Sequence, residues 1–139
     1  MMTIKELFDT LKRLDFSHYK YLIKSSGYNG SDFEKLEADF DNPDDQQMYF
    51  VLLNIITSLN EIHYDLEYYS KPVKSVETLY MNSDGRYECK SCVFHCGTQI
   101  EFFAHDVSWE LSTVEYGSNG YYVYGFKDVD MNGLKVRIR

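Results

Sequence analysis

The spacing of hydrophobic positions changes near residue 72, from the period of a helix to the period of a strand. Before this point apolar side chains recur every three or four residues, which places them on one face of a helix. After it they alternate with polar side chains, which is typical of antiparallel sheets. The pattern predicts an α+β protein with a helical region over residues 1–72 and a small antiparallel β-domain over residues 73–139.

The strongest helical signal runs from Pro43 to Ser70, after the start signal Asp41-Asn42-Pro43. Its apolar positions are spaced four, three, four, three, four, three: Met48, Leu52, Ile55, Leu59, Ile62, Leu66 and Tyr69. Such heptads can form a coiled-coil seam between two chains. The first helix offers a matching stripe, so we expect packing within the chain as a helical hairpin or bundle, and a monomer in preference to a homodimer.

Three shorter helices are predicted before this one. The first begins at Thr3, because Thr3 and Glu6 have the spacing of a capping box. The second covers Phe16 to Ser26 and ends at the Gly27-Tyr28-Asn29-Gly30 stretch. The third begins at Ser31 and continues to Phe40.

Seven short strands are predicted in the second region, separated by turns rich in Gly, Asn, Asp and Ser. They are Val76–Met81, Arg86–Cys89, Cys92–His95, Ile100–Ala104, Trp109–Tyr116, Gly120–Phe126 and Leu134–Arg137. No crossover helix separates them, which excludes a parallel sheet. Their number and length favour a small SH3-like β-barrel.

The charge of the chain excludes a broadly basic nucleic-acid binder. The 139 residues carry 14 Lys and Arg against 22 Asp and Glu, a formal net charge of -8. No apolar run approaches the roughly 18 residues of a membrane span, and Met1 to Lys12 is a charged amphipathic stretch rather than a signal peptide. We therefore expect a cytoplasmic protein that does not associate with membranes.

Acidic side chains are concentrated between Ser31 and Asp45, where seven acids stand against one base, Lys35. The acids are Asp32, Glu34, Glu37, Asp39, Asp41, Asp44 and Asp45. They can be ordinary helix N-terminal charges on a solvated face. The functional alternative is a partner-binding surface that imitates nucleic-acid phosphates and occupies a basic protein.

Basic and aromatic side chains near the end of the chain suggest a second kind of surface. Alternation places Lys135, Arg137 and Arg139 on one face of a strand. Together with the aromatic residues Tyr121, Tyr122 and Tyr124 they could contact a nucleic acid, or they could simply be an exposed strand face and barrel aromatics.

The three cysteines offer a weak metal signal. Cys89 and Cys92 have C-x2-C spacing, and His95 and Cys96 follow. On a strand His95 and Cys96 point to opposite faces, and a second C-x2-C pair is lacking, so we expect reduced thiols and no metal. No nucleophile motif, H-E-x-x-H sequence or P-loop is present, so we expect neither catalytic residues nor a cofactor.

Several segments from residue 65 onward resemble a small uncharacterised domain family of Gram-positive bacteria, their plasmids and their phages. The segments are "DLEYYSKPVKSVETLY", "NSDGRYE", "FHCGTQIE", "WELSTVEYGSNGYYVYGF" and "GLKVRIR". The matching positions are Lys71, Pro72, Val73, Gly85, Arg86, Tyr87, His95, Cys96, Gly97, Ile100, Glu101, Trp109, Tyr122, Gly125, Gly133, Leu134, Lys135, Val136 and Arg137. In that family a helix that ends in a Lys-Pro-Val-like turn leads into a small β-domain.

Proteins of this kind resemble some anti-CRISPR proteins of type II systems. The resemblance implies stoichiometric binding to a type II CRISPR nuclease or its guide RNA complex, without catalysis. Because the guide and target channel of such nucleases is strongly positive, an acidic inhibitor is expected to block guide RNA loading or target DNA engagement. The alternative is a nucleic-acid-binding adaptor or regulator of a mobile element that acts through the β-domain.

Overall fold

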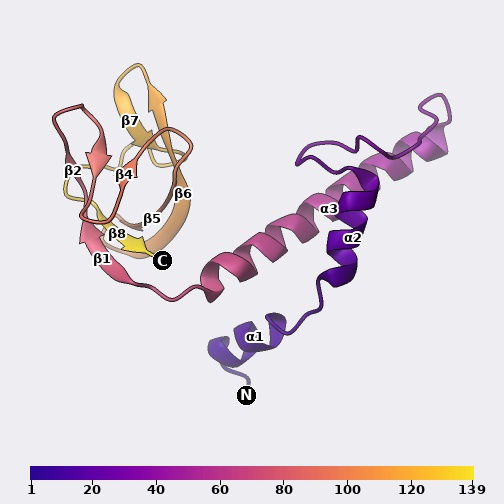
Figure 1. Ribbon diagram of the computed structural model, residues 1–139, viewed down its shortest axis with the longest axis horizontal. Coiled ribbons are helices and arrows are strands. Elements are labelled where there is room, and N and C mark those ends of the chain that lie inside the picture. Colours follow the sequence, from indigo (N-terminus) through magenta and orange to yellow (C-terminus); the bar gives the residue numbers. More distant parts are fainter. The chain divides into compact units, whose positions relative to one another are not determined.

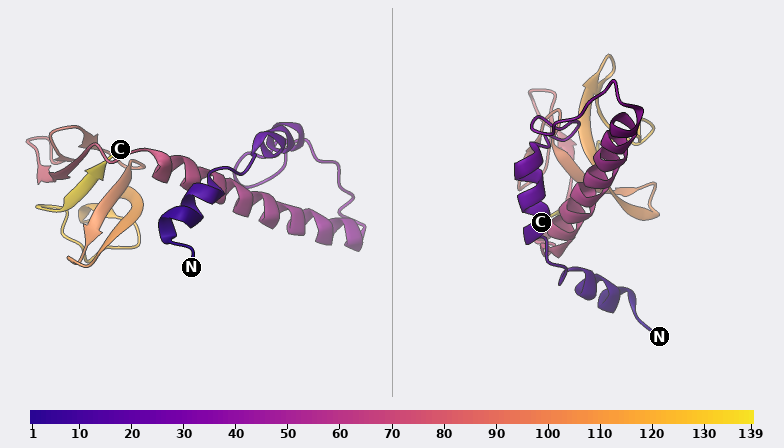
Figure 2. Two further views of the ribbon diagram at one scale, coloured as in Figure 1. Left: turned by 90° about the horizontal axis from the view of Figure 1, so that it is seen from below. Right: turned by 90° about the vertical axis from the view of Figure 1, so that its right-hand side faces the viewer.

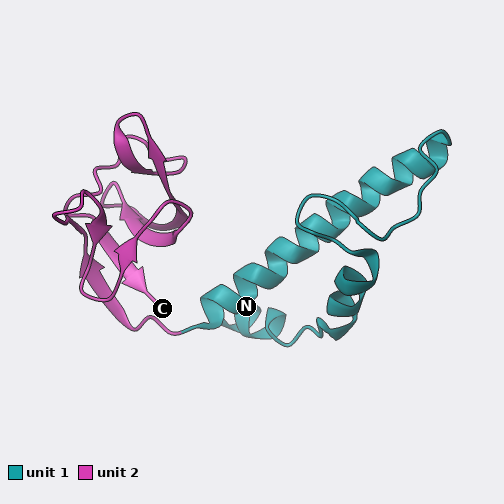
Figure 3. Cartoon of the chain, turned by 45° about the horizontal axis from the view of Figure 1, so that its top comes forward, with its two compact units in different colours: residues 1–71 teal, residues 72–139 magenta.

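The computed structural model describes residues 1–139, which form two compact units, Met1–Lys71 and Pro72–Arg139 (Figure 3). The first unit holds three helices, and the second holds antiparallel sheets of five and three strands. The α+β class predicted from the sequence is confirmed. The unit boundary lies one residue before the one we expected.

Helices α1 (Ile4–Leu11), α2 (Ser17–Ser26) and α3 (Pro43–Ser70) form the first unit (Figure 1). The capping box of α1 is present, because the Thr3 hydroxyl accepts from the Glu6 amide and the Glu6 carboxylate accepts from the Thr3 amide. At the start of α3 the Asn42 side chain accepts from the Asp44 amide at 3.0 Å. The bounds of α3 are those that the periodicity predicted. None of the three helices combines the length and the apolar character that crossing a membrane requires.

The helix predicted from Ser31 to Phe40 is absent, and that prediction is wrong. The amides of Glu34 and Lys35, which a helix would direct to residues 30 and 31, donate instead to the carbonyls of Gly27 and Ser26 at 3.1 and 3.0 Å. Asn29 Oδ1 accepts from the amides of Ser31 and Asp32, at 3.1 and 3.0 Å. Short polar side chains that bond locally in this way compete with helix formation, and the like charges of the segment add repulsion.

The core of the helical unit is small. It contains Phe33, Tyr49 and Ile56, and the rings of Phe33 and Tyr49 meet edge to face at 5.5 Å. Helix α2 lies beside α3 (Figure 2), where the Tyr19 hydroxyl donates to Asn60 Oδ1 at 2.7 Å. Helix α1 buries no residue. Its apolar stripe therefore does not supply the cover that we expected for α3.

Eight strands form the second unit, and every pairing between them is antiparallel. They are β1 (Ser75–Thr78), β2 (Tyr80–Met81), β3 (Tyr87–Glu88), β4 (Val93–Phe94), β5 (Gln99–Ala104), β6 (Ser108–Gly117), β7 (Gly120–Val123) and β8 (Lys135–Ile138). The larger sheet has the order β1-β8-β5-β6-β7, and the smaller has the order β2-β3-β4 (Figure 1). Neither sheet closes on itself, so the expected SH3-like barrel is not confirmed.

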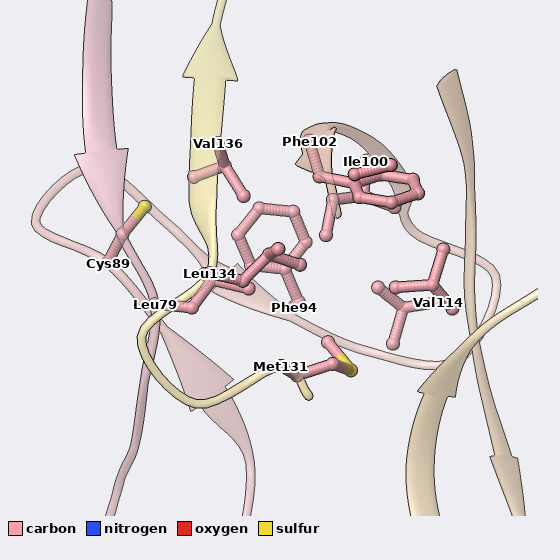
Figure 4. Packing of buried hydrophobic residues seen from close by; sticks show 11 residues of the cluster. Leu79, Cys89, Phe94, Ile100, Phe102, Val114, Met131, Leu134 and Val136 are labelled. Atoms are coloured by element: carbon pink, nitrogen blue, oxygen red, sulfur yellow. The ribbon is translucent and has the colours of Figure 1, made fainter. Parts of the chain in front are cut away.

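The β unit has a substantial hydrophobic core (Figure 4). On β5 the alternation of the strand turns Ile100, Phe102 and Ala104 inward, and each is almost completely buried. The full core consists of Leu79, Cys89, Phe94, Ile100, Phe102, Ala104, Val114, Val123, Met131, Leu134 and Val136. These residues come from both sheets and from the loop before β8, so one core joins the two sheets.

Candidate protein-binding site

All seven acids of the predicted acidic surface are exposed. Five lie on the loop between α2 and α3, and Asp44 and Asp45 lie in the first turn of α3. None of the seven forms an ion pair with a Lys, Arg or His side chain. The segment therefore keeps its negative charge uncompensated at the surface of the helical unit.

Hydrogen bonds hold this loop in a defined shape. Asp32 Oδ1 accepts from the Phe33 amide at 2.8 Å and from the hydroxyl of Tyr49 on α3. The Asp39 amide donates to Asp45 at 3.2 Å, which joins the loop to the first turn of α3. Gly27 is left-handed, with φ of 65°, and a Cβ there would lie 2.8 Å from Cγ of Lys35. Glycine is therefore needed where the loop leaves α2.

A hollow lies beside Asp32, one of these acids. Its volume is about 430 Å³, and it is lined by Ser31, Asp32, Phe33, Leu36, Phe40, Tyr49, Phe50 and Leu53. Phe40 and Phe50 are about half exposed, at 50% and 52%. The hollow combines these exposed aromatic side chains with one carboxylate, that of Asp32. Such a combination suits a segment of protein with apolar and basic side chains.

Two of the three basic residues predicted on the last strand, Arg137 and Arg139, share the carboxylate of a residue that the sequence reasoning missed. Glu101 on β5 lies opposite Arg137 in the strand register and is 3% exposed. Its carboxylate accepts from Arg137 Nη1 at 3.2 Å and from Arg139 Nε at 2.7 Å and Nη2 at 3.2 Å. Arg137 also stacks over the Trp109 ring at 4.1 Å. In the sequence, Glu101 stands between Ile100 and Phe102, which face inward. Strand alternation turns it to the other face, so its burial could not be predicted from this pattern.

The structure does not place the three predicted tyrosines beside the basic tail. Tyr121 and Tyr122 lie on β7, and Lys135 is exposed on β8, with β5 and β6 between these strands in the sheet. Lys127 Nζ lies 5.3 Å from the centre of the Tyr122 ring. Tyr124, after β7, is 65% exposed.

The three thiols form no disulfide and no metal cluster. Sγ of Cys89 and Sγ of Cys92 are 3.7 Å apart, while Cys96 is exposed and its thiol donates to Glu115 at 3.2 Å. No group of three or more His, Cys, Asp or Glu side chains is arranged to hold a metal ion. Burial, and then the neighbouring Cys89, raises the pKa of Cys92 to about 12. Cys92 is therefore a protonated thiol at neutral pH and a poor nucleophile.

Glu77 on β1 accepts several hydrogen bonds that lower its pKa. It accepts from the amide of Ser91 at 2.9 Å, from the Ser91 hydroxyl, and from the Ser75 hydroxyl at 2.7 Å. These bonds, those from Ser91 first, lower its pKa from 4.5 to about 2. Because Ser91 lies in the turn between β3 and β4, Glu77 joins the two sheets of the β unit.

Residues 77–138 match the sequence model of a family described as a domain of unknown function, DUF5348. The match agrees with the resemblance to an uncharacterised small-domain family, and it spans most of the β unit. It carries no stated activity, and the resemblance to anti-CRISPR proteins has no counterpart in it. No curated protein and no solved structure matches the chain.

Proposed function

We propose that this protein acts by binding another protein, without catalysis, through the surface between the α2–α3 loop and the start of α3. The observation that carries the proposal is the hollow with exposed Phe40 and Phe50. Its lining includes Asp32, one of the seven exposed acids on the loop and the start of α3 that lack a basic partner. Uncompensated negative charge steers a protein toward a basic surface. Exposed aromatic side chains in a hollow are the kind of group that anchors a protein interface.

For the partner we propose a type II RNA-guided nuclease, blocked at guide RNA loading or target DNA engagement. The channel of such a nuclease is positive over its length and accepts a charged polyanion. The resemblance of the β-domain segments to proteins of mobile elements supports this choice. Direct nucleic-acid binding by the β unit has less support, because Arg137 and Arg139 share the carboxylate of Glu101.

The test removes three acids whose side chains make no hydrogen bond in the structure. The variant carries Glu37→Gln, Asp41→Asn and Asp44→Asn, and it should fold as the wild type does. Its control carries Glu61→Gln, Asp65→Asn and Asp84→Asn, three exposed acids elsewhere in the chain, which gives the same net charge. Binding to a purified type II nuclease, with and without guide RNA, is measured together with cleavage of a target DNA.

We expect the wild type and the control to bind and to inhibit cleavage, and the test variant to bind at least tenfold more weakly. A further change, Phe50→Ser, should weaken binding again if the hollow takes part. Equal binding by the test variant and the control would overturn the acidic surface as the site. Absence of binding by the wild type to both forms of the nuclease would overturn the choice of partner. A shift of free RNA or DNA in a gel by the protein alone would favour the adaptor instead.

A further inference from the structure

The heptad stripe of α3 remains largely uncovered within the helical unit. Met48, Ile55 and Ile62 are 55%, 49% and 47% exposed, and Leu52 is exposed as well. Leu59 is half-buried. An exposed stripe of this size on one helix is unusual for a protein that works as a single chain.

The residues of the chain that pack against α3 contact a neighbouring stripe of this helix. Tyr49 and Ile56 are buried against Phe33 and the α2–α3 loop. Each follows a heptad residue, Met48 or Ile55, by one position, which is a rotation of about 100° around the helix. The core of the helical unit therefore lies mainly beside the heptad stripe, and of the stripe residues only Leu59 also packs against it.

We propose that α3 pairs with α3 of a second copy of this chain, along a seam formed by Met48, Leu52, Ile55, Leu59 and Ile62. The four-three spacing is the repeat that two helices need to stay in contact as they supercoil. The spacing continues in the sequence to Leu66 and Tyr69, but Leu66 is already buried in the single chain, so the proposed seam ends at Ile62. From Met48 to Ile62 the seam is about 21 Å long, at 1.5 Å per residue.

The charges of the helical unit favour an antiparallel pair. The segment from Ser31 to Asp45 carries seven acids and one Lys, and it lies at the N-terminal end of α3. A parallel pair would bring both copies of this segment to the same end, where they repel. An antiparallel pair separates them and places the helix dipoles in opposite directions.

This proposal goes beyond the binding function and rests on different side chains. The hollow uses Phe40, Phe50 and Leu53, whereas the seam uses the heptad residues of α3. An antiparallel dimer would present two copies of the hollow, one near each end. Loss of the dimer and loss of partner binding are therefore separable by mutation.

The test is the mass of the full chain in solution, by light scattering after gel filtration and by sedimentation. The chain mass is 16.4 kDa, and we expect a dimer of twice that value. Ile62→Lys should raise the dimer dissociation constant at least 100-fold and leave a monomer. The matched control is Tyr64→Lys, since Tyr64 is 48% exposed on α3 but lies outside the seam.

A wild type that stays monomeric at about 100 μM would overturn the proposal, and so would an Ile62→Lys variant that dimerises as the wild type does. Circular dichroism must show that both variants keep their helices. Orientation is measured with spin labels at Gln47→Cys, in a chain whose native cysteines are replaced by serine. For a seam centred on Ile55, antiparallel helices place the Cα atoms of the two labelled residues about 26 Å apart, and parallel helices place them within about 15 Å. The shorter distance would overturn the antiparallel arrangement.

Discussion

The β unit and the helical unit distribute their apolar residues in opposite ways. In the β unit, Phe102, Val114, Val123 and Val136 are completely buried. In the helical unit no residue is buried to that extent, and α1 buries none of its stripe. The difference teaches that the β unit is organised around its own core, whereas the helical unit leaves much of its apolar surface exposed.

Truncation of a core side chain in each unit tests this difference most strongly. Phe102→Ala should lower the free energy of unfolding of the β unit by about 3–5 kcal/mol, because a large buried ring leaves a cavity. Ile56→Ala should lower that of the helical unit by about 2 kcal/mol, since its surroundings are more open. Urea unfolding followed by Trp109 fluorescence reports the β unit, and ellipticity at 222 nm reports the helices. A larger loss at Ile56 would reverse the comparison.

The buried Glu101 extends the comparison to polar groups, because the helical unit has no buried carboxylate. Glu101→Gln leaves Arg137 and Arg139 without their counterion, and we expect a loss of about 2–3 kcal/mol. Arg137 stays partly accessible to water, which limits the effect. Glu110→Gln on β6 is the control and should change stability by less than about 0.5 kcal/mol. Equal effects in urea unfolding would show that the Glu101 pairs are dispensable.

Lowering the pH should reduce the free energy of unfolding of the β unit, because Glu77 becomes protonated. Because folding lowers the pKa of Glu77 from 4.5 to about 2, the folded state favours its ionised form. This contribution is complete above pH 5 and is lost as the pH falls from about 4.5 toward 2. Trp109 fluorescence during unfolding at several pH values measures it. Glu77→Gln should remove this part of the pH dependence, and an unchanged profile would contradict the assignment.

Thiol reactivity gives the smallest and most local test of the β unit. At pH 8 an aromatic disulfide reagent should modify Cys96 rapidly, because Cys96 is exposed. Cys89 is buried and Cys92 is held as a protonated thiol, so both should react only as the unit opens. Three equally fast thiols in the native protein would show that the core near the β3–β4 turn is open.

The sequence was informative where a local pattern determines structure. The bounds of α3 follow from its heptads, from the Asn42 cap and from Pro72, and the turn at Asn82 follows from a side chain that accepts from the amides of Asp84 and Arg86. The sequence was misleading from Ser31 to Phe40. Apolar spacing there predicted a helix, but the structure has a loop whose amides at Ser31 and Asp32 donate to the Asn29 side chain.

Contacts between residues that lie far apart in the chain could not be predicted from the sequence. The basic strand face was predicted from alternation, but Glu101 lies 36 residues from Arg137 and became visible only through the strand register. The hollow likewise joins Leu36 and Phe40 of the loop to Phe50 of α3. The binding role of the seven acids stays a prediction; the structure shows that they are exposed, and the path of the loop determines which of them form hydrogen bonds.

The position of β8 in the larger sheet has a consequence for the synthesis of this protein. β8 lies between β1 and β5, although it is the last strand to be made. Ser75 and Lys135 are 60 residues apart, so β1 waits roughly 3–12 s for its neighbour at typical rates of translation. The helical unit leaves the ribosome first, and the five-stranded sheet is completed only when residues 135–138 follow. A nascent chain stalled before Lys135 would leave β1 unpaired and open to proteases and chaperones.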